Sequence, residues 1–116
     1  MNYVDGFLCA VLNANKDAYT EHAKKVGGLF KEYGALTVVD CWGDDVPEGK
    51  LTSFTMAVKR EENESVIFSW ITWPSKAVRD EAWKKLMADE RMTQADSPPF
   101  DGKRMIYGGF QMIAQS

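Results

Sequence analysis

The sequence has few of the residues that build metal, disulfide and redox sites. Its 116 residues include one histidine, His22, and two cysteines, Cys9 and Cys41. Two cysteines cannot form the disulfide framework of a small secreted protein, and they do not match a CxxC motif. The scattered acids match no zinc spacing, and the sequence contains no GxGxxG, Walker A or nucleophile-elbow motif. We therefore expect two reduced cysteines in a cytoplasmic protein with no metal and no cofactor.

Excess positive charge and long apolar runs are also missing. Lys plus Arg total 14 against 17 Asp plus Glu, which gives a formal net charge of −3. This balance argues against nucleic acid or an anionic membrane as a partner, because such surfaces need clustered cations. No stretch approaches the roughly 18 apolar residues of a membrane helix, and Asp5 interrupts the N-terminal apolar run, which lacks a basic signal-peptide region. The length suits a single domain over residues 1–116.

Apolar periodicity divides the chain into six main elements. Asn15 and Ser75 are suited to cap the two helices, and Gly34 is suited to end the first of them. Residues 51–58 are ambiguous between a strand and a helical turn, and residues 89–103 are expected to form a turn-like connection with one more helical turn. The predicted order is a strand at 3–12, a helix at 16–33, strands at 35–42 and 65–73, a helix at 76–88 and a strand at 104–113.

This β-α-β-β-α-β order predicts an α+β, ferredoxin-like fold, with an antiparallel sheet and two helices on one of its faces. In the usual order, 4-1-3-2, the third strand separates the first two, so Cys9 and Cys41 lie at least about 9.6 Å apart. A disulfide needs about 4.4 to 6.8 Å between Cα atoms, and the two should not pair. The strands are apolar on both sides while the helices cover one face, so we expect a homodimer that buries the other face.

Five segments spread over the chain resemble a known family. These segments are YVDGF, FKEYGAL, DCWGDDVPEGK, SWITWPSKAVRD and PFDGKRMIYGGF. Together they resemble the YbaA-like family of small bacterial proteins, which carries a domain of unknown function and is similar to the dimeric α/β-barrel superfamily. The resemblance implies that fold and a cavity between sheet and helices, but it implies no particular reaction.

His22 is the first candidate functional residue. It lies near the middle of the apolar arc of the predicted helix at 16–33. Such a residue is either a core histidine that is hydrogen-bonded to a neighbour, or a general base or ligand donor in a helix–sheet cavity. The second interpretation is open because histidine titrates near neutral pH.

Arg79 falls inside the apolar arc of the predicted helix at 76–88. An isolated buried charge is strongly unfavourable, so its guanidinium needs either a carboxylate of the protein or an anionic group of a ligand. Asp5 and Asp40 are candidate partners, because each lies in a strand flanked by apolar residues. Either aspartate can instead serve as a catalytic base.

Three aromatic residues, Trp42, Trp70 and Tyr107, are candidates to contact a flat ligand, or they belong to the core or the dimer interface. The glycine pairs at 27–28 and 108–109 either make room for a ligand or permit tight packing.

The stretch VDCWGDDVPEGK contains four carboxylates in twelve residues. Asp44, Asp45 and Glu48 belong to a solvated turn, which lacks the alternating oxygen ligands of a calcium loop. Asp40 and Trp42 share one face of the preceding strand, and therefore point either into the cavity or into the dimer interface.

Three functions remain open from the sequence. The first is an enzyme on a small aromatic or carboxylated metabolite, in which His22 or an aspartate abstracts a proton and Arg79 holds an anionic group. The second is a binding module that captures a metabolite without chemical change. The third is a dimer whose polar residues are all structural.

Overall fold

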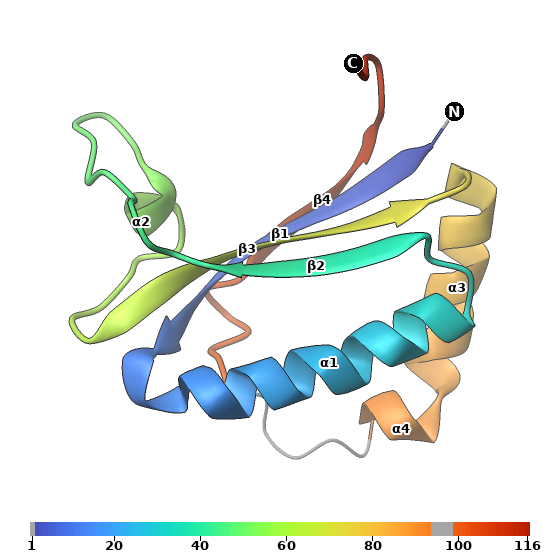
Figure 1. Cartoon of the computed structure of the whole chain (residues 1–116), viewed down its shortest axis with the longest axis horizontal. Coiled ribbons are helices and arrows are strands. Elements are labelled where there is room, and N and C mark those ends of the chain that lie inside the picture. The colour runs from blue at the N-terminus through green and yellow to red at the C-terminus, as the bar shows by residue number, and fades with distance from the viewer. Residues whose placement is uncertain (1, 94–98) are drawn as a thin grey trace.

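A four-stranded antiparallel sheet lies at the centre of the computed structural model, which describes residues 2–93 and 99–116 (Figure 1). β1 (Tyr3–Leu12) pairs with β3 (Glu64–Trp73) along its whole length. β2 (Thr37–Trp42) pairs with β3, and β4 (Ile106–Gln111) pairs with β1, so that the order is β2-β3-β1-β4. The predicted separation of the first two strands is confirmed, and the cysteines they carry are both free.

The helices α1 (Lys16–Glu32) and α3 (Lys76–Ala88) lie on one face of the sheet, together with the short α4 (Glu90–Thr93), as Figure 1 shows. This confirms the predicted placement of the two main helices. The turn expected within 89–103 is α4, whereas residues 94–98 of that connection lie outside the described residues.

Two of the three predicted helix caps are confirmed. Ser75 Oγ accepts a hydrogen bond from the backbone N–H of Val78 at 3.2 Å. Gly34, at φ +117°, follows α1 in the left-handed conformation that glycine adopts without strain. Asn15 occupies the predicted position directly before α1, but its side chain makes no capping hydrogen bond. A 3₁₀ turn, η1 (Asn13–Asn15), holds its backbone at φ −99° and ψ 12°, outside the extended conformation of a capping residue.

The second strand begins later than the sequence predicts. The N–H of Ala35 donates to the carbonyl of Phe30 at 3.0 Å, and that of Gly34 donates to Lys31 at 3.1 Å. These two bonds form a Schellman motif, so Ala35 belongs to the end of α1 and not to the strand.

The ambiguous segment 51–58 contains the short helix α2 (Phe54–Ala57), which Ser53 caps by accepting from the N–H of Met56 at 3.0 Å. In Figure 1, α2 lies on the opposite side of the sheet from α1, near one end of β3. Its Phe54 packs edge-on against Phe68 of β3, with ring centroids 5.9 Å apart.

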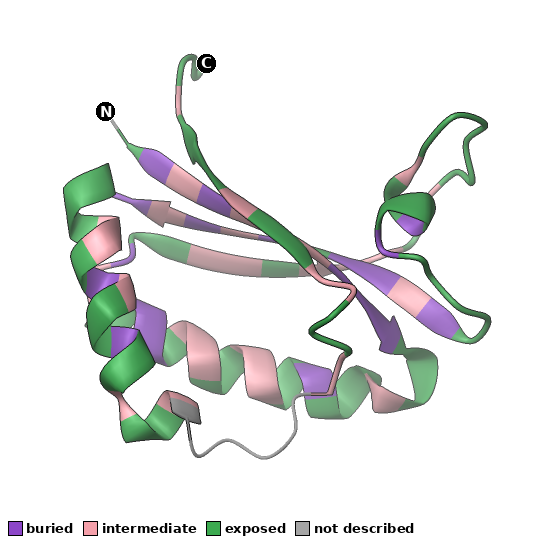
Figure 2. Cartoon of the chain, turned by 180° about the vertical axis from the view of Figure 1, so that it is seen from behind, coloured by how far each residue is buried: buried purple, intermediate pink, exposed green. Residues whose placement is uncertain are grey.

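The two faces of the sheet differ in what covers them. The side chains of Tyr3, Asp5 and Cys9 are buried on the helix side, where Trp73 and Leu86 complete the core. On the opposite face no helix among the described residues covers the middle of the sheet, and Figure 2 shows β4 exposed along most of its length. Within the described part of the chain, no helix combines the length and the apolar character needed to cross a bilayer.

Candidate functional site

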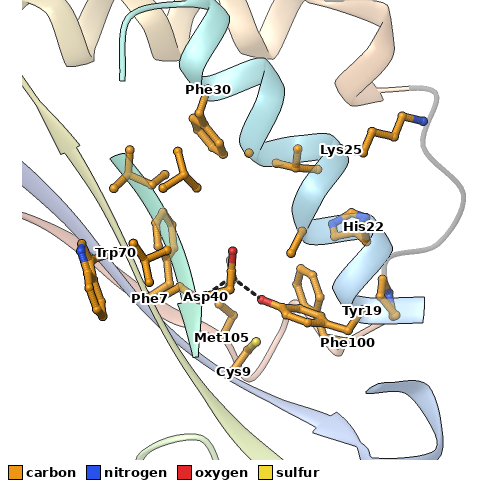
Figure 3. A pocket seen from close by; sticks show the side chains of 18 of the residues that line it. Phe7, Cys9, Tyr19, His22, Lys25, Phe30, Asp40, Trp70, Phe100 and Met105 are labelled. Carbon is orange, nitrogen blue, oxygen red and sulfur yellow. Dashed lines mark hydrogen bonds between the residues drawn. The ribbon is translucent and has the colours of Figure 1, made fainter. Parts of the chain in front are cut away.

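A cavity of about 680 Å³ lies between α1 and the helix-covered face of the sheet (Figure 3). Six elements and the segment 99–105 contribute to its walls. Most of the lining is apolar. Among the polar side chains, those of Tyr19 and Ser69 lie at Asp40 of β2, whereas Lys25 and Arg91 lie elsewhere on the walls. The main apolar and aromatic side chains are Phe7, Phe30, Ile71, Trp83, Phe100 and Met105.

Asp40 lines the cavity and is hydrogen-bonded to two other polar residues of its lining. Its Oδ1 accepts a hydrogen bond from Tyr19 Oη at 2.8 Å and another from Ser69 Oγ at 2.6 Å. The register of the sheet places Asp40 directly opposite Ser69, and α1 presents Tyr19 from above. Asp40 is nonetheless exposed, because β2 is an edge strand. Of the two directions that the sequence left open for Asp40, the cavity and the dimer interface, the structure shows the first.

His22 lines the same cavity, nearly one helical turn after Tyr19. Its ring lies 6.0 Å from that of Phe100 and 6.4 Å from that of Tyr19, measured between centroids. Partial burial lowers the pKa of His22 below its usual value of 6.5, and the negative charge of Asp40 opposes this effect. The imidazole is therefore mainly neutral near pH 7 and can accept a proton.

Neither the thiol nor the phenol of the cavity is ionised at neutral pH. Burial raises the pKa of Cys9 to about 11, and burial together with the charge of Asp40 raises the pKa of Tyr19. The protonated phenol of Tyr19 donates to Asp40, and the protonated thiol of Cys9 is not suited to act as a nucleophile, because a nucleophilic cysteine requires the thiolate. In residues 2–93 and 99–116, no three His, Cys, Asp or Glu side chains gather so as to hold a metal ion.

Arg79 and Asp5, two of the predicted site residues, pair with each other outside the cavity lining. Arg79 Nη2 donates to Asp5 Oδ1 at 2.7 Å, and Arg79 Nε lies 3.1 Å from both carboxylate oxygens. Arg79 also reaches Asp80 at 3.0 Å. Of the two alternatives for Arg79, a carboxylate of the protein or an anionic group of a ligand, the structure shows the first, and of the two candidate aspartates Asp5 is the partner.

Asp5 accepts two further hydrogen bonds, so that both of its carboxylate oxygens have donors. Trp73 Nε1 and Trp83 Nε1 donate to Asp5 Oδ2 at 2.9 and 3.0 Å. Because Trp83 also lines the cavity, the buried ion pair holds one wall of the cavity in place from behind. This satisfied carboxylate has a structural role, and the interpretation of Asp5 as a base gains no support from its surroundings.

The three aromatic candidates lie in different places. Trp42 borders a smaller hollow that adjoins the cavity at Asp40, and the ammonium of Lys16 lies 5.4 Å from the centre of its ring. Trp70 borders the cavity, but Figure 3 shows its ring on the far side of β3 from α1. Tyr107 is 73% exposed on β4, where it stacks on Phe7 with centroids 6.5 Å apart. The cavity thus brings together His22 and Asp40, with Trp42 beside them.

The sequence did not identify three residues of the site as functional candidates: Tyr19, Ser69 and Phe100. Tyr19 lies three residues before His22 on the same helical arc, and this spacing is a signal that could have identified it. Ser69 is recognisable only once the register between β2 and β3 is known. Phe100 follows a connection without periodicity, so no local pattern indicates its place.

A buried ion pair holds the segment 99–105 against the sheet. Arg104 donates from Nη1 and Nη2 to the two carboxylate oxygens of Glu64, both at 2.8 Å, and from Nη1 to the carbonyl of Lys59 at 3.0 Å. The hydrogen bonds from Arg104 lower the pKa of Glu64. This ion pair lies directly beside Met105 in the chain, and both Phe100 and Met105 line the cavity.

The fold and the cavity define an α+β protein with a four-stranded antiparallel sheet and a mainly apolar hollow under its helices. Residues 2–102 match the family described as "Protein of unknown function (DUF1428)", and the chain belongs to this family. It is 62% identical over 114 residues to proteins described as "Uncharacterized protein YbaA" from Escherichia coli K12, Escherichia coli O157:H7 and Shigella flexneri. Each match covers 97% of this chain and 97% of the relative. The resemblance to the YbaA-like family is thereby confirmed, and the function of the family is unknown.

Proposed function

We propose that the protein binds a small, mainly apolar and aromatic molecule in the cavity between α1 and the sheet. The observation that carries this proposal is a hollow of about 680 Å³ in which apolar walls surround a few convergent polar groups. Small-molecule sites typically occupy about 300–1,000 Å³ and have this composition. Asp40, Tyr19 and His22 supply the polar contacts that would orient the molecule.

The proposal includes a homodimer with the ferredoxin-like, dimeric α/β-barrel plan. The strand order, read from β4, is 4-1-3-2, and the uncovered sheet face carries Phe68, Ile106 and Phe110, which are 46%, 44% and 61% exposed. Exposed aromatic and aliphatic side chains on one face are typical of an interface. We expect dimers at micromolar concentration in sedimentation equilibrium and monomers after Phe110→Glu. A monomeric parent protein would refute this part of the proposal. Two free cysteines suit the reducing cytoplasm, where we place the dimer.

A second candidate function, cofactor-free catalysis, is favoured by one observation: His22 and Asp40 line the same cavity. A mainly neutral imidazole is a suitable proton acceptor near pH 7. The anion holder that the sequence suggested, Arg79, is engaged by Asp5 outside the cavity, so binding without chemical change is the function we favour. His22→Ala separates the two, because it should abolish turnover in an enzyme and leave most of the affinity in a binding module.

The test is a binding screen with neutral aromatic fragments such as indole and 2-naphthol, followed by ¹H–¹⁵N NMR spectra. Ala23 lines the cavity from α1, so Ala23→Trp should fill it and remove binding. Ala77→Trp, at an exposed position of α3, is the matched control and should leave binding unchanged. Ala18→Trp, at an exposed position of the cavity rim, replaces the first variant if that one does not fold. The proposed function is refuted if fragments bind all variants with equal affinity, or if no fragment binds the wild-type protein.

A further inference from the structure

We propose that the molecule bound in this cavity is an amine, whose ammonium group is held by Asp40 while its apolar body lies among the aromatic side chains. This inference rests on the proposed function and assigns the chemical class of the ligand.

The first argument is the state of the Asp40 carboxylate. Asp40 is the only carboxylate among the described residues that line the cavity. Tyr19 and Ser69 both donate to Oδ1, which fixes the orientation of the group, while no described residue donates to Oδ2. An ionised carboxylate accepts several hydrogen bonds, so Oδ2 remains available to a donor on the ligand. Figure 3 shows the carboxylate pointing into the space between β2 and α1.

The second argument is the aromatic surface around it. The rings of Phe7, Phe30, Trp83 and Phe100 line the same cavity, together with that of Tyr19. Phe30 and Trp83 meet edge to face with centroids 5.1 Å apart, so the aromatic wall is continuous there. Aromatic faces attract cations through their quadrupole and also pack well against an apolar body. A carboxylate set among aromatic rings is a combination that favours an organic cation.

The third argument is the placement of the cations near the cavity. Arg91 lines it, but Glu32 and Asp89 bind its guanidinium. Figure 3 shows Lys25 pointing away from Asp40, toward the outside of α1. Arg79, the buried cation that could have received an anion, is engaged by Asp5. A carboxylated ligand would therefore meet the negative charge of Asp40 without a buried cation to balance it.

Two probes with the same ring and opposite charge test the inference: phenethylamine and 3-phenylpropionate. Titration of the wild-type protein followed by ¹H–¹⁵N NMR should show that the amine binds at least roughly threefold more tightly than the acid. This is a modest factor, because Asp40 is exposed and solvent screens its charge. Asp40→Asn should lower the affinity for the amine by roughly three- to tenfold and raise the affinity for the acid, because it removes the negative charge. The local structure should be kept, since the asparagine carbonyl can still accept from Tyr19 and Ser69. Asp45→Asn, in the exposed loop after β2, is the matched control and should change neither affinity.

The inference is overturned if the acid binds the wild-type protein as tightly as the amine, a comparison that needs no variant. It is also overturned if a folded Asp40→Asn protein binds the amine with unchanged affinity. In both cases, binding of neutral 2-naphthol in the cavity would leave the proposed function standing. If 2-naphthol and both charged probes fail to bind, the proposed function fails as well.

Discussion

Replacement of Arg79 by alanine would leave the carboxylate of Asp5 buried without its cation. The Asp5 side chain is 4% exposed and that of Arg79 is 23% exposed, so water cannot readily replace the guanidinium. The substitution removes the contacts from Nη2 at 2.7 Å and from Nε at 3.1 Å. Trp73 and Trp83 continue to donate to the second carboxylate oxygen, which reduces the loss but does not neutralise the charge.

The expected destabilisation is about 3 kcal/mol. Removal of one partner from a buried ion pair costs about 3–5 kcal/mol, and the remaining indole donors favour the lower end of this range. Small domains have about 5–15 kcal/mol of unfolding free energy in total, so this loss is a large fraction of the stability. The midpoint of thermal unfolding should fall by roughly 12 °C, at about 4 °C for each kcal/mol.

Urea denaturation of Arg79→Ala, Asp5→Asn and the double variant measures the coupling between the two residues. The double variant should be more stable than the sum of the single losses predicts, because neither partner is then left alone. Lys84→Ala, at an exposed position of the same helix, is the control and should have little effect. A loss below about 1 kcal/mol for Arg79→Ala, or additive single effects, would show that Asp5 does not depend on Arg79.

Four further predictions concern other parts of the molecule. Gly28→Ala should stabilise the protein by up to about 1 kcal/mol in urea denaturation, because a Cβ there meets nothing within 4 Å in the middle of α1. Gly109→Ala should destabilise the protein by about 1–3 kcal/mol, since the new Cβ would lie 2.5 Å from the hydroxyl of Tyr3. Equal effects at the two glycines would contradict this close approach of Tyr3 to β4. Folding lowers the pKa of His22 below 6.5, so the unfolded state binds more protons in this range. The contribution of His22 to stability should therefore be fully present above about pH 6.5 and decline as the pH falls. In denaturation curves at pH 5 and pH 7, His22→Gln should reduce this difference in stability. Iodoacetamide should label the half-buried Cys41 well before the buried Cys9, whose pKa of about 11 keeps it protonated; mass spectrometry showing equal rates would contradict the burial of Cys9.

Local patterns in the sequence predict most of the fold, because each main element carries its own signal. An apolar run predicts β1, and the serine before α3 predicts where that helix begins. The errors arise where a neighbouring turn competes with the local signal. Ala35 has the composition of a strand residue, yet the Schellman motif that ends α1 takes its N–H group. Asn15 has the chemistry of a cap, yet the preceding 3₁₀ turn gives it the wrong backbone conformation.

The candidate site is predicted less completely, because its geometry depends on which strands lie side by side. Helical periodicity indicates that Arg79 is buried, but only the placement of β1 beneath α3 shows that Asp5 is its partner. Alternation shows that Trp70 is on one face of its strand, but not which face the helices cover. Tyr19 and His22 share a helical arc in the sequence, while their meeting with Phe100 depends on a chain segment that Arg104 holds in place.

The measurement that tests the central claim most directly is the set of intermolecular NOEs between 2-naphthol and the protein. If the cavity under α1 binds the molecule, its ring protons should show NOEs to Phe100, Met105 and Trp83. NOEs only to Phe68 and Phe110 on the uncovered sheet face, or none to any side chain, would contradict the account.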